Sequence, residues 1–144
     1  IHEKWDRGTH FIIKFIQLFW DRIMSKRILI VDDSRLARRM LKDAIPPQCA
    51  YEIDEACNGM EALEFCRTAK VDILFLDLTM PEMDGYQLLE KLQNENILPF
   101  VIIVSADIQP KARERVLYLG AKTFINKPIN PEKIYSCFQE QGLL

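Results

Sequence analysis

Apolar and polar residues follow one another in blocks along this chain, and from residue 27 onward the blocks predict alternating strands and helices. Three blocks, at residues 28–31, 73–76 and 100–104, are apolar throughout. Uninterrupted apolar runs of this length are typical of strands that helices cover on both faces of a parallel sheet. Segments with apolar residues at helical spacing separate these runs, so right-handed crossovers predict a doubly wound α/β fold.

Local signals place the ends of these elements. Ser34 and Asp84 are suited to cap helices, Pro110 suits a first helical turn, and Gly120 suits a helix end. The pair at residues 58–59, Asn-Gly, predicts a turn. The pattern thus predicts five strands, at residues 27–31, 51–57, 71–77, 99–106 and 122–126, and five helices, at 35–45, 60–69, 85–96, 109–120 and 130–141.

Residues 1–24 differ from the rest of the chain. Their apolar and aromatic run is only about ten residues long, too short to span a bilayer, and it lacks the cleavage pattern of a signal peptide. Most of its large apolar residues share one helical face: Ile12, Phe15, Ile16, Phe19, Trp20 and Ile23. We expect residues 1–24 to form an N-terminal extension, an amphipathic helix, and residues 25–144 to form the main domain. Either the natural protein starts at Met24 and the residues before it come from an upstream start assignment, or the extension is a docking or dimerising helix.

Composition narrows the class of protein. The chain has 144 residues with a net charge of −2, so it lacks the basic excess of a general nucleic-acid binder. Its four cysteines have no metal-binding spacing and no accompanying histidine cluster. We therefore expect free thiols in a reducing cytoplasm rather than a metal site or a disulfide framework.

Polar side chains follow four of the five predicted strands at their carboxyl ends. Asp32 and Asp33 follow the first strand, Asp77 ends the third, Ser105 lies at the end of the fourth, and Lys127 follows the fifth. Parallel strands end on one edge of a sheet, where ligands bind at the point of strand-order reversal. Asp33, Ser105 and Lys127 each have an ordinary structural explanation, as a cap, a turn residue and a solvated side chain. Asp77 is harder to explain in this way because it comes directly after a buried run, and together the residues predict one site.

The chemistry of this set points to phosphoryl transfer. Carboxylates crowded on one edge raise one another's pKa values unless a cation neutralises them, and all-oxygen ligands suit Mg²⁺. A lysine and a hydroxyl group on the same edge add a positive charge and a hydrogen-bond donor, both of which can bind an anion. Mg²⁺, lysine, hydroxyl and a carboxylate are the groups needed to place a phosphoryl group on an aspartate. Asp54, Asp72 and Asp84 are expected to be structural.

The ordered motifs ILIVDDS, ILFLDLTMPEMDG, IIVSA and INKP resemble the receiver domain of two-component response regulators, from about residue 26 to the end of the chain. The resemblance implies a flavodoxin-like five-stranded parallel sheet, in the order 2-1-3-4-5, with five flanking helices. It also implies a stand-alone signalling protein of the chemotaxis or phosphorelay type in the cytoplasm. A receiver excised from a longer protein stays open as an alternative.

The same resemblance implies a role for each site residue. Asp77 is the expected phospho-acceptor, with a sensor histidine kinase or phosphotransfer protein as donor. Mg²⁺ is expected to bind Asp33 directly, Asp32 partly through water, Asp77, and the backbone carbonyl of Thr79. Lys127 is expected to pair with the phosphoryl oxygens. Such a protein catalyses only its own phosphorylation and dephosphorylation.

The output is expected to be a two-state switch. Ser105 moves to the phosphoryl group and vacates space for Phe124, which occupies a position that is often tyrosine in the family. The small Ala106 leaves access to the site open. A downstream protein, which the sequence does not identify, then reads the face formed by helix 109–120, strand 122–126 and helix 130–141, without contact with nucleic acid.

The resemblance also assigns two kinds of supporting residue. Thr79 and Asp107 stand where the family tunes autodephosphorylation. Pro128 is expected to follow a cis peptide bond that positions Lys127.

Two alternatives remain. A phosphatase of the haloacid dehalogenase type also has a nucleophilic aspartate after a buried strand, but it needs a second aspartate two residues later, where this chain has Thr79. A receiver-like scaffold that is never phosphorylated would differ only in whether Asp77 takes a phosphoryl group.

Overall fold

The computed structural model describes residues 6–106 and 109–144 and contains one parallel sheet of five strands in the order β2-β1-β3-β4-β5. This order confirms the doubly wound fold. The strands are β1 (Arg27–Val31), β2 (Glu52–Ala56), β3 (Ile73–Leu76), β4 (Phe100–Ser105) and β5 (Ala121–Asn126). All four pairings are parallel, so the carboxyl ends of the strands lie along one edge.

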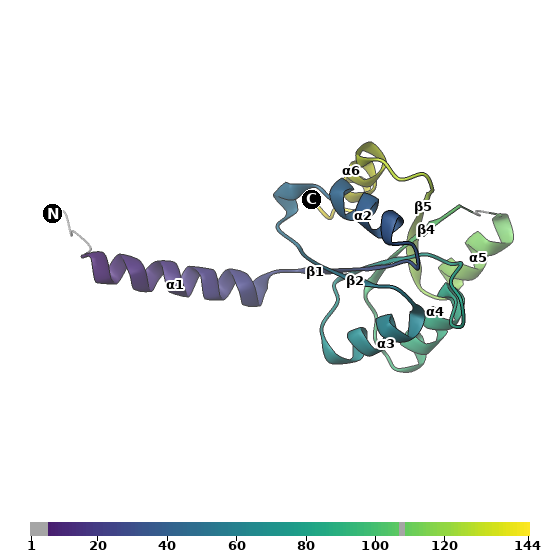
Figure 1. Ribbon diagram of the computed structural model, residues 1–144, viewed down its shortest axis with the longest axis horizontal. Helices are drawn as coiled ribbons and strands as arrows, with labels where there is room; N and C mark the ends of the chain where they lie inside the picture. The colour runs from purple at the N-terminus through teal and green to yellow at the C-terminus, as the bar shows by residue number, and fades with distance from the viewer. Residues whose placement is uncertain (1–5, 107–108) are drawn as a thin grey trace.

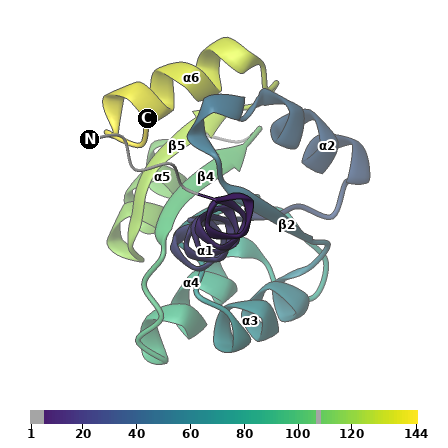
Figure 2. The ribbon, with the colours of Figure 1, turned by 90° about the vertical axis from the view of Figure 1, so that its left-hand side faces the viewer.

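Five helices cover the two faces of the sheet. Figures 1 and 2 show α2 (Arg35–Ala44) and α6 (Pro131–Glu140) on one face, with α3 (Gly59–Thr68), α4 (Gly85–Asn94) and α5 (Pro110–Tyr118) on the other. A short 3₁₀ turn, η1 (Pro47–Cys49), follows α2. The layers explain the apolar runs: every residue of β3 is buried, whereas the edge strand β5 mixes buried and exposed positions.

Helix caps match the sequence signals with one correction. The Ser34 hydroxyl accepts from the Ala37 N–H, and Asp84 caps α4 within a reciprocal capping box. Residues 58–59 do not form a free turn. Asn58 is the N-cap of α3, its side-chain oxygen accepts from the Glu61 N–H at 2.8 Å, and Gly59 is already helical.

Helix α1 (Arg7–Met24) projects away from the sheet ahead of β1 (Figure 1), and Figure 2 looks nearly along its axis. The Asp6 carboxylate caps it by accepting from the Thr9 N–H at 2.6 Å. Its large apolar side chains are exposed rather than packed on the domain: Phe11, Ile12, Ile13, Phe15, Ile16, Leu18, Phe19 and Trp20. Within the described residues, no helix combines the length and apolar character that crossing a bilayer requires.

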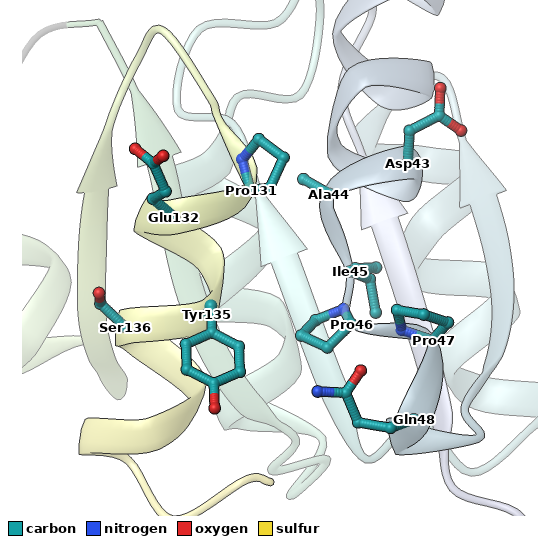
Figure 3. A pocket seen from close by; sticks show the side chains of 10 residues that line it. All are labelled: Asp43, Ala44, Ile45, Pro46, Pro47, Gln48, Pro131, Glu132, Tyr135 and Ser136. Atoms are coloured by element: carbon teal, nitrogen blue, oxygen red, sulfur yellow. The ribbon is translucent and has the colours of Figure 1, made fainter.

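A surface groove of about 460 Å³ lies between the end of α2 and the start of α6 (Figure 3). Prolines from both segments and Tyr135 line it, with the Asp43 and Glu132 carboxylates also present. None of its lining residues belongs to the polar set at the strand ends. The groove is therefore separate from the candidate site.

Candidate functional site

The sheet brings the predicted polar residues to one edge. Asp32 and Asp77 follow the neighbouring strands β1 and β3, Ser105 ends β4, and Lys127 follows β5. Asp32, Asp77 and Ser105 are only 5%, 6% and 2% exposed, so among the described residues they are the polar exceptions in an apolar interior. Buried polar groups of this kind need partners, and the partners show what the site can do.

Three carboxylates converge at this edge. One oxygen each of Asp32, Asp33 and Asp77 lies within 4.8 Å of the others. Asp33 is exposed, so the cluster is open to solvent on one side. Hard divalent cations such as Mg²⁺ take carboxylate oxygens together with water, and this donor set fits such an ion.

Among the described residues, Lys127 is the only cationic side chain that forms an ion pair with a carboxylate of the cluster. Its Nζ donates to Asp32 Oδ2 at 2.8 Å and lies 3.8 Å from Asp77 Oδ2. Burial alone would lower the pKa of Lys127, but the hydrogen bond to Asp32 and the charge of Asp77 outweigh it, so the pKa is raised. The lysine is therefore charged at neutral pH and available to a bound anion.

The acidity of the Asp77 carboxyl is shifted by its surroundings. Burial, followed by the neighbouring charge of Asp32, raises the pKa of Asp77 to about 6. The positive charge of Lys127 and the Thr79 N–H, which donates to Asp77 Oδ1 at 3.5 Å, oppose this rise but do not cancel it. An ionised Asp77 is thus a destabilised, reactive carboxylate when no cation is bound.

Contacts around Asp32 hold the loop after β1. The Asp32 N–H donates to Ala56 O at 3.2 Å, and the Ser34 N–H donates to Asp32 Oδ1 at 2.9 Å. The Arg38 guanidinium, from α2, donates to Asp32 O at 2.7 Å. Sequence reasoning missed Arg38, because one arginine in a helix with several basic residues carries no local signal of this contact.

The loop after β3 is held by close approach of α4. The Gly85 N–H donates to Leu78 O at 3.1 Å, and a side chain at Gly85 would bring its Cβ to 2.7 Å from Asp77 O. Glycine is therefore required for the helix to start this close to the backbone of Asp77. Thr79, in the same loop, is exposed.

The remaining predicted residues lie beside the cluster. Ala106 is exposed, and the Lys127–Pro128 peptide bond is cis. The Phe124 ring is half-buried and lies under the Arg113 guanidinium, with 3.8 Å from the guanidinium carbon to the ring centroid. Asp107 lies outside the described residues.

The sequence matches known response regulators. It is 40% identical over 112 residues to the chemotaxis protein CheY of Thermotoga maritima, covering 77% of this chain and 92% of that protein. It is 41% identical over 118 residues to the response regulator GtcR of Aneurinibacillus migulanus, covering 82% of this chain but only 48% of GtcR. The chain thus spans nearly all of one relative and about half of the other.

Solved structures show the same fold. A CheY-like receiver domain protein from Methanospirillum hungatei superimposes with a TM-score of 0.73 at 28% identity, covering 81% of this chain and 93% of that one. The response regulator domain of Thermotoga maritima CheB has a TM-score of 0.71 at 30% identity, covering 81% and 92%. Residues 28–139 match the response regulator receiver domain. From this match and these relatives, the chain belongs to the response regulator receiver domain family, of the CheY type.

Proposed function

We propose that this protein is a signalling switch in which Asp77 accepts a phosphoryl group, in the presence of Mg²⁺, from the phosphohistidine of a sensor histidine kinase or phosphotransfer protein. The observation that carries the proposal is the burial of Asp77 beside the Asp32 carboxylate and the Lys127 ammonium group. Membership of the receiver family supports phosphorylation-dependent signalling in general.

The transfer needs only groups at this edge. An oxygen of ionised Asp77 attacks phosphorus, an O–P bond forms, the N–P bond of the donor breaks, and the imidazole keeps the electron pair and takes a proton. Lys127, whose Nζ lies 3.8 Å from Asp77 Oδ2, is proposed to neutralise a phosphoryl oxygen. The raised pKa of Asp77 makes its ionised carboxylate more nucleophilic, and the phosphoryl charge that the reaction adds has to be neutralised by Lys127 and Mg²⁺.

Asp32, Asp33, Asp77 and the backbone carbonyl of Thr79 are proposed to hold Mg²⁺. A bound Mg²⁺ neutralises carboxylate and phosphoryl charge. The exposure of Asp33 leaves the metal position open to water and donor phosphate. Thr79 and Asp107 are proposed to tune the hydrolysis of the acyl phosphate, and the exposed Ala106 keeps the approach open.

The output is proposed to pass through β4 and β5. Ser105 moves toward the phosphoryl group, Phe124 fills the vacated space, and a partner protein reads the face of α5, β5 and α6. Phe124 has no hydroxyl, so its contribution is packing alone. The stack of Arg113 on Phe124 ties α5 to this movement.

Two further proposals concern the rest of the molecule. Residues 25–144 are proposed to be the receiver domain, working in the cytoplasm, where the free thiols of the four cysteines are stable. Residues 1–24 are proposed to be an extension whose helix α1 pairs with a second copy of the chain. Ile12, Ile16 and Phe19 are exposed and have the four-then-three spacing of a coiled-coil seam.

The dimer is tested by sedimentation of the full chain beside an Ile16→Lys variant. We expect a dimer that the substitution converts to a monomer. A monomeric wild-type chain at the highest soluble concentration would contradict the pairing of α1.

The decisive experiment for the switch is incubation with acetyl phosphate and Mg²⁺, followed by intact mass measurement beside an Asp77→Asn control. We expect one added phosphate, absent from the control and without Mg²⁺. If no adduct forms, we would measure binding of beryllofluoride, which only a working site binds. Binding would indicate a receiver whose phosphoryl group is short-lived, and no binding would indicate a scaffold that is never phosphorylated. Release of phosphate from small phosphate esters would instead favour the phosphatase alternative.

A further inference from the structure

Arg38 connects three elements beside the acidic cluster. Its guanidinium donates from one nitrogen to Asp32 O at 2.7 Å and from Nε to Glu55 Oε1 at 3.1 Å. The side chain starts on α2, reaches the loop after β1, and ends on β2. Only 14% of the Arg38 side chain is exposed, whereas the Glu55 side chain is 37% exposed, so the contact with Asp32 O is the more shielded of the two.

The carbonyl that Arg38 contacts belongs to the peptide unit joining Asp32 to Asp33. Because the peptide unit is planar, holding this carbonyl fixes the positions of the Asp33 N and Cα atoms, from which the Asp33 side chain leaves the backbone. Asp33 is exposed, so burial in the core does not orient its side chain. The Ser34 N–H, which donates to Asp32 Oδ1 at 2.9 Å, holds the loop from the other side.

The charge of Arg38 would by itself oppose this arrangement. A positive charge one peptide away from a cation site lowers the affinity for the cation. Glu55 forms an ion pair with Arg38 at 3.1 Å, which compensates that charge and holds the guanidinium plane toward the carbonyl. The pair therefore supplies a rigid hydrogen-bond donor with little net charge.

We infer that Arg38, oriented by Glu55, is a positioning residue that holds the Asp32–Asp33 peptide in the arrangement required for divalent metal binding. The inference rests on the proposed metal site. Residues that orient metal ligands typically change metal affinity about 10- to 100-fold when removed.

Coulomb interaction and positioning predict opposite signs for the same substitution. Arg38→Ala removes a positive charge near the cation, so charge alone predicts tighter metal binding. Positioning predicts weaker binding, because the Asp33 carboxylate is no longer held beside Asp32 and Asp77. The direction of the change therefore decides between the two effects without a fine comparison of magnitudes.

The experiment measures the affinity of the full chain for Mn²⁺, used as the probe, from the electron paramagnetic resonance signal of free Mn²⁺. The variants are Arg38→Ala, Arg38→Lys and the control Arg39→Ala, which removes the same charge from an exposed position in α2. We expect both Arg38 variants to raise the Mn²⁺ Kd at least about 10-fold. Arg38→Lys keeps the positive charge but lacks the planar pair of donors of the guanidinium group. Arg39→Ala should change the Mn²⁺ Kd by no more than about 2-fold because solvent and salt screen the charge of the exposed Arg39.

A second readout separates positioning from a general loss of structure. The Mg²⁺ concentration for half-maximal phosphorylation by acetyl phosphate should rise in the Arg38 variants, while the rate at saturating Mg²⁺ recovers. Thermal melting identifies folded variants, and if Arg38→Ala does not fold, Arg38→Lys decides.

A folded Arg38 variant with wild-type or tighter Mn²⁺ binding would overturn the inference. Wild-type protein that binds no Mn²⁺ would overturn the metal site and the inference together. Mn²⁺ binding by wild type with neither a phosphoryl adduct nor beryllofluoride binding would overturn the proposed function alone.

Discussion

The substitution Asp77→Asn should stabilise the metal-free protein, and only above a defined pH. Burial and the charge of Asp32 raise the pKa of Asp77 from 3.8 to about 6 in the folded state. Below both values the carboxyl is neutral in folded and unfolded chains, so it carries no penalty. As pH rises from about 4 to about 6, the unfolded chain ionises first and the native state loses stability relative to it.

The size of the effect follows from the same shift. A rise from 3.8 to about 6 corresponds to about 3 kcal/mol at ~1.4 kcal/mol per pKa unit. The Asp77 side chain is only 8% exposed, so solvent screens little of this penalty. The stability gained by Asp77→Asn should therefore grow by about 2 kcal/mol between pH 4.5 and pH 7.5.

Urea unfolding in EDTA at the two pH values measures this growth. Carboxyls outside the cluster of Asp32, Asp33 and Asp77 have the same surroundings in both proteins, so their contributions to the pH dependence cancel in the difference. Asp43→Asn, at an exposed position of α2, is the control and should change stability by less than about 0.5 kcal/mol at either pH. Added Mg²⁺ should stabilise the wild type more than Asp77→Asn.

One result would refute the reasoning about Asp77. If the stability difference between Asp77→Asn and wild type is the same at pH 4.5 and pH 7.5, then ionised Asp77 is not destabilised in the fold. The description of Asp77 as a reactive buried carboxylate would then be wrong.

Three further predictions concern neighbouring residues. Gly85→Ala places a Cβ 2.7 Å from a backbone carbonyl oxygen, so it should destabilise the domain in urea by about 1–3 kcal/mol; an unchanged midpoint would contradict the close approach of α4. Lys127→Met removes a charged hydrogen bond of 2.8 Å and should lower stability at pH 7 by about 1.5–3 kcal/mol and slow phosphorylation by acetyl phosphate; equal rates would argue against its role at the phosphoryl group. Arg113→Ala removes the stack on Phe124 and should lower stability by about 0.5–1 kcal/mol while increasing ring mobility in NMR spectra; an unchanged ring signal would show that the stack does not restrain Phe124.

Local patterns were sufficient for the elements and for most of the candidate site. The apolar runs at 28–31 and 73–76 identified buried strands, because only a strand covered on both faces excludes polar residues from successive positions. The convergence of Asp32, Asp77 and Lys127 also followed from the sequence, since parallel strands end on one edge whatever the details of packing. The strand order was inferred from the family resemblance and was confirmed.

Other features depended on how the elements pack. The Lys127 Nζ lies 2.8 Å from Asp32 Oδ2 but 3.8 Å from Asp77 Oδ2. This difference depends on side-chain conformations, which the positions of the strand ends do not fix. Asn58 caps α3 instead of forming a turn because the residues from Gly59 onward are helical, and the first N–H groups of a helix need an acceptor. The exposure of the apolar side chains of α1 likewise depends on where the helix projects from the domain.

The sequence by itself determined which residues reach the carboxyl edge of the sheet, because strand periodicity and capping are properties of neighbouring residues. Only the tertiary structure decided which side chains hold that edge in place. Arg38, on α2, contacts Asp32, which is six residues earlier in the chain, and Glu55, which is on β2. Both contact distances depend on how α2 docks on the sheet. A docking angle is set by packing across the whole core, so no local pattern specifies it.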